Sequence, residues 1–343
     1  MGILHSIAQG VRTGLQGLTI LSEANSFEEN RVIGSKRLNR YGLHRWRVRN
    51  AARLTASRRA RLASNVKPEW REQLARNGFV VVENVFPPEE FEQVRKALLE
   101  QAWPVRDMVQ GDTITRRAAI DRAMMDTVPP LRRLLSADWF RWLARYVSSF
   151  DVEPLHYVQS IIKPRTGSPD PQLSFHADTF HSSMKAWLFL QDVTPGEGAF
   201  TYVRGSHRLT PERLAWEHEI ALTLPEGGDR MTRRGSFRVN LDDLERLGLP
   251  QPEELAVKAN TLVVADTFGF HARGPSGPDL SRVELWSYSR RNPFIPWLGG
   301  DIFSLPFLAP RRVGWLWQLR DRFPKLLKQP WKPVGHKRMT ELP

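Results

Sequence analysis

The stretch from Phe175 to His207, FHADTFHSSMKAWLFLQDVTPGEGAFTYVRGSH, decides the fold, and it opens with His176-Ala177-Asp178. In an extended strand, residues two apart face the same side, so the side chains of His176 and Asp178 can reach one metal ion together. A third ligand has to come from elsewhere, and ADTFGFHARGPSGPDLSRVELW (265–286) supplies His271. Two histidines and one carboxylate that leave three positions open form the facial triad typical of non-haem Fe(II) oxygenases.

A His-x-Asp pair alone is a weak signal, and the neighbouring sequence strengthens it. The pair precedes an apolar run, Ala186–Leu190, that is typical of a strand, and His271 follows the similar run Thr261–Ala265. Arg282 lies eleven residues after His271, at the start of the strand-like segment Val283–Ser289. A guanidinium at that place could hold a carboxylate through two parallel hydrogen bonds.

The order of these motifs resembles the phytanoyl-CoA dioxygenase family of Fe(II)/2-oxoglutarate oxygenases. That family shows a His-x-Asp pair, a Trp-bearing strand, a Gly-Ser-His loop, a distal His and an Arg eleven residues further on. The corresponding residues here are His176 and Asp178, Trp187, Gly205-Ser206-His207, His271 and Arg282. The segment NGFVVVENVFPPEEFEQVRKAL (77–98) also resembles the N-terminal part of the family, and the resemblance covers roughly residues 70 to 292.

The resemblance implies the fold and the chemistry. The fold would be mainly β with flanking helices, around a double-stranded β-helix of the jelly-roll or cupin kind. His176, Asp178 and His271 would be the catalytic iron ligands, and Arg282 and Trp187 would bind 2-oxoglutarate. Fe(II), 2-oxoglutarate and O2 would be required, with ascorbate as a further reductant. Related halogenases lack the carboxylate ligand, so the presence of Asp178 favours hydroxylation.

The pattern of elements agrees with that fold class. Short apolar runs separated by Gly and Pro loops predict strands over 79–85, 156–162, 185–190, 200–203, 262–265 and 283–289, which is typical of a sandwich or barrel. Helical periodicity and helix-start residues predict helices over 68–76, from Pro87-Pro88 to about residue 102, and over 131–150. Two further helices are expected as insertions over 209–220 and 241–248.

The composition fits one catalytic domain with extensions. The chain has 343 residues, 41% hydrophobic and 25% charged, and no cysteine, so no disulfide is possible and a reducing compartment is allowed. No apolar run approaches the length of a membrane-spanning helix, and the N-terminus lacks a secretory pattern. We expect a basic N-terminal extension over 1–66, a dioxygenase domain over 67–295 and a basic, Trp-rich extension over 296–343.

The positive charge is concentrated at the two ends. Residues 31–66 hold eleven Lys or Arg and no acid, and residues 311–343 hold nine Lys or Arg and two acids. Because the net charge is +13, the remainder of the chain is net −5. Such ends attract phosphate backbones, anionic lipids or acidic glycolipids, whereas the simpler interpretation is a pair of solvated tails.

Apolar residues accompany these charges. The N-terminus carries an amphipathic stripe of Leu4, Ile7, Val11, Leu15 and Leu18. The C-terminal region carries Trp315, Trp317 and Trp331 among its cations. Trp beside basic residues suits a membrane–water interface, and packing of each Trp on the catalytic body is an equal alternative.

Four further residues are candidates for substrate contact. Lys163 and Arg165 precede a loop near the expected mouth of the site and could bind an acidic substrate. His181 lies five residues after His176, where its spacing takes it off the metal-binding face. Arg273 competes with Arg282 as the 2-oxoglutarate anchor, and the eleven-residue family spacing favours Arg282, leaving Arg273 for the substrate.

The longer wording HADTFHSSMKAWLFLQDV, YVRGSHRLTPERLAWEH and LWSYSRRNPFIPW is similar to the bacterial Kdo 3-hydroxylases. Those enzymes oxidise 3-deoxy-D-manno-oct-2-ulosonic acid (Kdo) on lipopolysaccharide precursors, peripherally on the cytoplasmic face of the inner membrane. The resemblance therefore implies an acidic glycolipid substrate and contact with an anionic membrane. The alternatives are a hydroxylase of a soluble CoA thioester or small acid, and a nucleic-acid binder that uses residues 31–66. The intact triad and Arg282 argue against the latter, so no nucleic-acid partner is expected.

Overall fold

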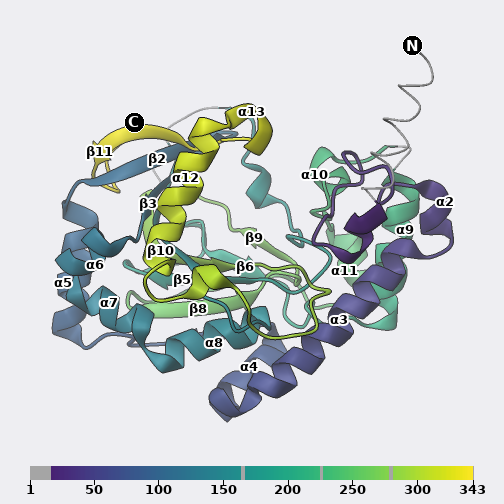
Figure 1. Cartoon of the computed structure of the whole chain (residues 1–343), viewed down its shortest axis with the longest axis horizontal. Helices are drawn as coiled ribbons and strands as arrows, with labels where there is room; N and C mark the ends of the chain where they lie inside the picture. Colours follow the sequence, from purple (N-terminus) through teal and green to yellow (C-terminus); the bar gives the residue numbers. More distant parts are fainter. Residues whose placement is uncertain (1–16, 164–166, 225–226, 278–280, 343) are drawn as a thin grey trace.

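The computed structural model describes residues 17–163, 167–224, 227–277 and 281–342. Two antiparallel sheets face each other, and helices cover the outside (Figure 1). The large sheet has the strand order β1-β8-β5-β10-β4-β3-β2-β11, and the small sheet has the order β7-β6-β9. Apart from the consecutive strands β2, β3 and β4, most neighbouring strands of the large sheet are far apart in the sequence, as in a jelly roll, so the predicted double-stranded β-helix class is confirmed.

The strands are short, and their apolar residues alternate between two faces. Their bounds are β1 Phe79–Val82, β2 Trp103–Gln110, β3 Thr113–Ala119, β4 Leu155–Ile162, β5 Met184–Phe189, β6 Phe200–Tyr202, β7 Glu253–Glu254, β8 Thr261–Asp266, β9 His271–Arg273, β10 Ser281–Ser289 and β11 Lys332–Lys337.

Most helices lie at the edges and on the outer face of the large sheet, whereas α12 crosses in front of it (Figure 1). Their bounds are α2 Lys36–Arg40, α3 Leu43–Leu62, α4 Pro68–Asn77, α5 Pro88–Glu100, α6 Arg122–Thr127, α7 Pro129–Ser136, α8 Asp138–Ser148, α9 Pro211–Thr223, α10 Arg230–Arg233, α11 Leu241–Arg246, α12 Arg312–Arg322 and α13 Pro324–Leu327.

The main core lies between the outer face of the large sheet and these helices. On β10, Val283 and Leu285 face this core, together with Phe140 and Leu143 of α8. The alternate residue Trp286 faces inward, toward a second cluster shared with the small sheet. A strand with both faces buried reads as a continuous apolar run, which explains why β5 and β8 were recognisable from the sequence.

Most predicted elements are present, with one helix divided. The segment 131–150 was expected to be a single helix and is two, α7 and α8, because Ala137 between them has an extended backbone (ψ 128°). The short strands β7 and β9 were not predicted, and neither were the longer strands β2, β3 and β11. Polar and basic residues interrupt the apolar alternation of these longer strands, as in the sequence TITRRAA of β3.

The basic N-terminal segment packs against the catalytic body as α2 and α3. Arg47 is buried and donates to the carbonyls of Ile20, Ser22 and Ala24. Arg58 is also buried, and it donates to the main chain at Ser149, Pro293 and Ile295. Part of the charge that was interpreted as a solvated or anion-binding tail therefore holds loops together. The predicted amphipathic stripe falls mostly within residues 1–16, which lie outside the described residues.

The C-terminal segment also belongs to the body. Strand β11 pairs with β2 as the last strand of the large sheet, and α12 crosses in front of the sheet (Figure 1). Trp317 and Trp331 are buried, while Trp315 is 43% exposed. The alternative that Trp packs on the catalytic body therefore holds for Trp317 and Trp331, and the membrane-interface interpretation is wrong for these two. No helix within the described residues is long and apolar enough to cross a membrane.

Candidate active site

Main-chain hydrogen bonds bring the three predicted metal ligands together. His176 and His271 exchange two main-chain hydrogen bonds, each 3.0 Å long, and the N–H of Asp178 donates to the carbonyl of Thr267 (3.0 Å). His176 forms two isolated bridges, with Arg238 and with His271, so the expected continuous strand around His176 and Asp178 is absent from this part of the described chain. The ligands are aligned instead by the pairing of His176 with the chain around His271.

The side chains converge on one point. The Nε2 atoms of His176 and His271 each lie 3.6 Å from Oδ1 of Asp178, and the ligand atoms of all three residues lie within 4.8 Å of one another. Each imidazole donates from Nδ1 to a main-chain carbonyl, that of Ser174 for His176 (2.8 Å) and that of Gly269 for His271 (2.9 Å). These bonds fix the tautomer that leaves Nε2 free to coordinate a metal.

The cluster fits a bound metal ion. His271 Nε2 is buried and has no hydrogen-bond partner among the described residues. Burial and the neighbouring His271 lower the pKa of His176 to about 3, so His176 is neutral, as a ligand must be. Two ligands at right angles with bonds of about 2.1 Å stand about 3 Å apart. A small inward movement of these side chains would therefore complete a facial site for Fe(II).

Glycine at position 269 is required by close packing beside His271. A Cβ atom there would lie 1.8 Å from the hydroxyl oxygen of Tyr202, which donates to the carbonyl of Asp266 (2.8 Å). Any larger residue would displace the tyrosine or the loop that carries His271.

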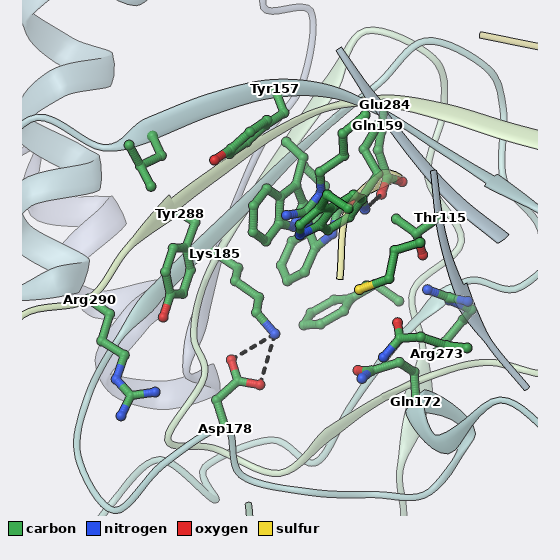
Figure 2. Close-up of a pocket in the computed structure, with 18 of the residues that line it drawn as sticks. Thr115, Tyr157, Gln159, Gln172, Asp178, Lys185, Arg273, Glu284, Tyr288 and Arg290 are labelled. Atoms are coloured by element: carbon green, nitrogen blue, oxygen red, sulfur yellow. Dashed lines mark hydrogen bonds and ion pairs between the residues drawn. The ribbon is translucent and has the colours of Figure 1, made fainter. Parts of the chain in front are cut away.

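The cluster opens into a cavity of about 440 Å³ between the two sheets. Figure 2 shows Asp178 at its base, with Tyr288 and Arg290 on one side and Gln172 and Arg273 on the other. The charged residues that line it are Arg117, Asp178, Lys185, Arg273, Arg282, Glu284, Arg290 and Arg320. The aromatic residues are Tyr157, Trp187, Phe200, Trp286, Tyr288, Trp317 and Trp331.

Both residues predicted to bind 2-oxoglutarate line this cavity. Trp187 of β5 packs on Phe200, with ring centroids 4.4 Å apart. Arg282 of β10 is buried, and it donates from Nε to Oε2 of Glu284 (2.9 Å) and from Nη1 to the carbonyl of Gly198. Its remaining nitrogen, Nη2, has no partner among the described residues, so Arg282 is held in place with one edge free.

The residues predicted to contact substrate are separated by the structure. Arg273 lines the cavity and is paired with Asp170, and burial lowers the pKa of Arg273. Lys163 lies beside Asp112 (3.3 Å) and His181 is buried, and neither lines the cavity. Arg165 lies outside the described residues.

Sequence reasoning missed several residues of the cavity wall, and strand alternation was the available signal. On β10, Arg282, Glu284, Trp286 and Tyr288 all face the cavity, so the choice of Arg282 implied the others. Lys185 likewise stands two residues before Trp187 on β5. Arg117 could not be placed, because its strand β3 was not predicted.

Lys185 is the partner of the metal-binding carboxylate. Its Nζ lies 2.8 Å from Oδ1 and 2.7 Å from Oδ2 of Asp178, and Figure 2 shows the two side chains pointing toward each other. Burial alone would raise the pKa of Asp178. The positive charge of Lys185 beside the carboxylate instead holds that pKa well below its usual value. Lys185 thus balances the carboxylate in the absence of a metal ion.

Replacing Lys185 by Met is expected to destabilise the metal-free protein by about 1–3 kcal/mol, because Asp178 is left as an unpaired, enclosed carboxylate. Mn2+ should then stabilise the variant more than it stabilises the wild type, because no ammonium group opposes the cation. Urea unfolding with and without Mn2+ measures both effects. A smaller metal-induced gain in Lys185→Met would instead mean that Lys185 is needed to orient Asp178 for binding.

One family model matches part of the chain. Residues 74–228 match the family model of phytanoyl-CoA dioxygenase, a range that includes His176, Asp178 and Trp187 and ends before His271. A search of curated proteins found no significant match.

The structural comparison also found similar solved structures. The epimerase SnoN, in complex with Fe3+, alpha ketoglutarate and nogalamycin RO, is 19% identical, with a TM-score of 0.41 over 64% of this chain and 81% of that chain. HygX from Streptomyces hygroscopicus, with nickel and 2-oxoglutarate bound, is 19% identical, with a TM-score of 0.39 over 65% and 86%. The carbocyclase SnoK is 19% identical, with a TM-score of 0.36 over 66% and 84%.

The sequence match and the converging ligands are independent observations. The first comes from residues 74–228, and the second joins that segment to His271, which lies outside it. When bound, iron and 2-oxoglutarate supply the oxidising chemistry, while the protein holds the ligands, anchors the cosubstrate and limits the access of water. On these grounds the chain is a non-haem Fe(II)- and 2-oxoglutarate-dependent enzyme, and its residues 74–228 are similar to the phytanoyl-CoA dioxygenase family.

Proposed function

We propose that this enzyme hydroxylates an acidic sugar lipid, the Kdo residue of lipopolysaccharide precursors. The excess of positive charge in the cavity is the observation that carries the proposal. Six cationic side chains line the cavity against two carboxylates, Asp178 and Glu284. Arg273 and Arg290 are paired with Asp170 and Glu23, which lie outside the lining. Because the metal and 2-oxoglutarate carry equal and opposite charges, Arg117 and Arg320 remain without a counter-ion among the described residues in the loaded site. An acidic substrate would compensate these two cations.

The surface beside the cavity supports a substrate presented at a membrane. Between residues 297 and 323, large apolar side chains are unusually exposed, and they are Trp297, Ile302, Phe303, Leu305, Phe307, Trp315, Leu319 and Phe323. Arg311, Arg312, Arg320 and Arg322 lie in the same segment. Exposed apolar groups beside cations suit peripheral contact with an anionic leaflet, each cation near the surface contributing up to about 1 kcal/mol. The proposed location is the cytoplasmic face of the inner membrane.

The residues of the cavity have distinct roles in this reaction. His176, Asp178 and His271 hold the metal on one side and leave the cavity side open to cosubstrate and substrate. Arg282 anchors the far carboxylate of 2-oxoglutarate through its free edge, with Trp187 and Phe200 as the adjoining wall. The tryptophans of α12 and of the segment before β11, Trp317 and Trp331, close the opposite wall, so that water is excluded from the bound substrate.

The test compares lipopolysaccharide from cells with and without this protein, and from cells that carry His271→Ala. We expect a +16 Da species, an added oxygen, on the Kdo region only in cells with the active enzyme. Membrane binding should weaken in high salt without vanishing, because salt screens the charges and leaves the apolar contacts. Lipopolysaccharide of unchanged mass, together with a fully soluble active enzyme, would rule the glycolipid substrate out.

The second candidate is a hydroxylase of a soluble CoA thioester or small acid. The same cationic cavity favours it, and it requires no membrane contact. Turnover of a soluble acid by the purified enzyme, with no effect of added anionic vesicles, would select this candidate. A nucleic-acid role for residues 31–66 is weakened, because Arg47 and Arg58 are committed to buried main-chain carbonyls.

A further inference from the structure

Arg117 lies inside the cavity and is surrounded by aromatic rings. Its guanidinium carbon is 3.8 Å from the ring centroid of Trp286, 4.5 Å from that of Trp331 and 5.0 Å from that of Tyr157. These rings come from β10, from the chain before β11 and from β4, so three separate segments enclose one cation. Cation–π contacts of this kind hold a guanidinium in a fixed plane without neutralising it.

A chain of hydrogen bonds fixes Arg117 further and links it to the cosubstrate anchor. Arg117 donates from Nε to Oε1 of Gln159 (2.8 Å), and Gln159 donates from Nε2 to Oε1 of Glu284 (2.8 Å). The other oxygen of Glu284 accepts from Nε of Arg282 (2.9 Å). Because Nε of Arg117 is occupied, the two terminal nitrogens remain, and the described residues offer them no hydrogen-bond partner.

A second cation, Arg320 of α12, lines the same cavity and forms no ion pair with any described residue. Burial raises the pKa of Tyr157, and the charges of Arg117 and Arg320 act in the opposite direction on the same hydroxyl. Both guanidinium groups therefore line the cavity close to the Tyr157 hydroxyl. Burial also lowers the pKa of Arg117 to about 10, as expected for a cation that lacks a counter-ion.

We infer that Arg117 and Arg320 form the carboxylate-binding subsite for the prime substrate. The ligand is a carboxylate-bearing polar molecule such as a sugar acid. Its carboxylate would take paired hydrogen bonds from the terminal nitrogens of Arg117, and its body would lie against Tyr157, Trp286 and Trp331. This inference rests on the proposed function in taking the ligand to be the substrate.

The known cosubstrate is the competing source of a carboxylate. The structure favours separate sites, because Arg282 and Arg117 are held apart by the intervening Gln159 and Glu284. Glu284 is paired with Arg282 and only hydrogen-bonded to Gln159, so its negative charge lies nearer the cosubstrate anchor. An anion therefore meets a less compensated cation at Arg117 than at Arg282.

The experiment uses the full-length enzyme loaded with Mn2+ and 2-oxoglutarate. The probes are Kdo, N-acetylneuraminate and glucuronate, each compared with its methyl ester by calorimetry. The wild type is expected to bind at least one acid about tenfold or more tightly than its ester, which corresponds to 1.4 kcal/mol. In Arg117→Gln that preference should fall to less than about twofold, with the affinity for 2-oxoglutarate changed by less than about twofold.

Arg320→Gln is the second variant, and it lies on a surface helix where the substitution does not disturb the sheet. It should reduce the acid preference about threefold or more, since it removes one of two charges. Arg204→Gln is the matched control. Arg204 also stacks on an aromatic ring, that of Phe79 at 5.0 Å, but lies outside the cavity lining, so its removal should leave the preference unchanged.

Three results would overturn the subsite. These are the absence of acid preference for every probe in the wild type, its retention in both Arg117→Gln and Arg320→Gln, and a loss of 2-oxoglutarate affinity in Arg117→Gln with the acid preference intact. The carboxylate subsite and the proposed glycolipid substrate can fail independently of each other. Arg117-dependent acid binding without oxygen added to cellular Kdo would keep the subsite and remove the glycolipid.

Discussion

Alanine at His176, Asp178 or His271 is expected to abolish iron retention and to lower 2-oxoglutarate turnover more than about 100-fold. Removing even a residue that supports a metal ligand commonly costs 10- to 100-fold, and these residues are the ligands themselves. The three ligand atoms lie within 4.8 Å of one another, and no other group of three or more His, Cys, Asp or Glu among the described residues is arranged this way. Two remaining ligands therefore have no nearby substitute.

Metal analysis after anaerobic loading, together with succinate formation, measures both effects. His181→Ala is the control for iron retention, because His181 is buried and only five residues from His176, yet lies outside the cluster. Circular dichroism should show that each variant is folded. A variant at any of the three positions that keeps one iron per chain and full turnover would remove that residue from the site.

The triad could be predicted from the sequence because two signals coincided. The spacing of His176 and Asp178, and the apolar run before His271, are local features. The contact that brings the two segments together is not local. The two segments are joined by a pair of main-chain hydrogen bonds between His176 and His271, which are 95 positions apart. The residue pattern of either segment alone does not predict this pairing.

The other residues of the cavity wall could not all be predicted, because some lie on strands whose sequences lack the usual alternation of apolar and polar residues. β3 carries Arg117 within TITRRAA, where consecutive arginines on opposite faces break the expected alternation of apolar and polar residues. Arg116 is fully buried against Asp107 on one face, and Arg117 points into the cavity on the other. Buried ion pairs and cation–π contacts stabilise both, and these depend on partners that only the fold brings near.

The C-terminal tryptophans illustrate the same limit. Trp315 and Trp317 differ by two positions on α12, so they point in different directions around the helix. Trp317 packs on Tyr157 with ring centroids 5.9 Å apart, whereas Trp315 is exposed. The sequence alone does not show which of the two tryptophans is buried. The orientation of α12 against β4 decides it.

Arg282→Ala is expected to raise the KM for 2-oxoglutarate far more than that for the prime substrate. Removing one partner of a desolvated, hydrogen-bonded ion pair costs about 2–5 kcal/mol, or roughly 30- to 4000-fold. Arg273→Ala should change the KM for 2-oxoglutarate less than about threefold, because Arg273 is already paired with Asp170. Steady-state kinetics with each component varied in turn measure both. The reverse pattern would identify Arg273 as the anchor.

Glu284 provides a sharper form of this test. In Arg282→Ala the carboxylate of Glu284 loses the partner that lies 2.9 Å away and faces the incoming cosubstrate as an uncompensated charge. Part of the loss is then repulsion by Glu284, and the double variant Arg282→Ala with Glu284→Gln should recover about tenfold or more of the KM for 2-oxoglutarate. Glu284→Gln alone should leave this KM unchanged or lower it, since Arg282 gains freedom to bind. If Glu284→Gln gives no recovery in the double variant, the cosubstrate carboxylate does not approach Arg282, and the anchor has to be sought among the other cations of the cavity.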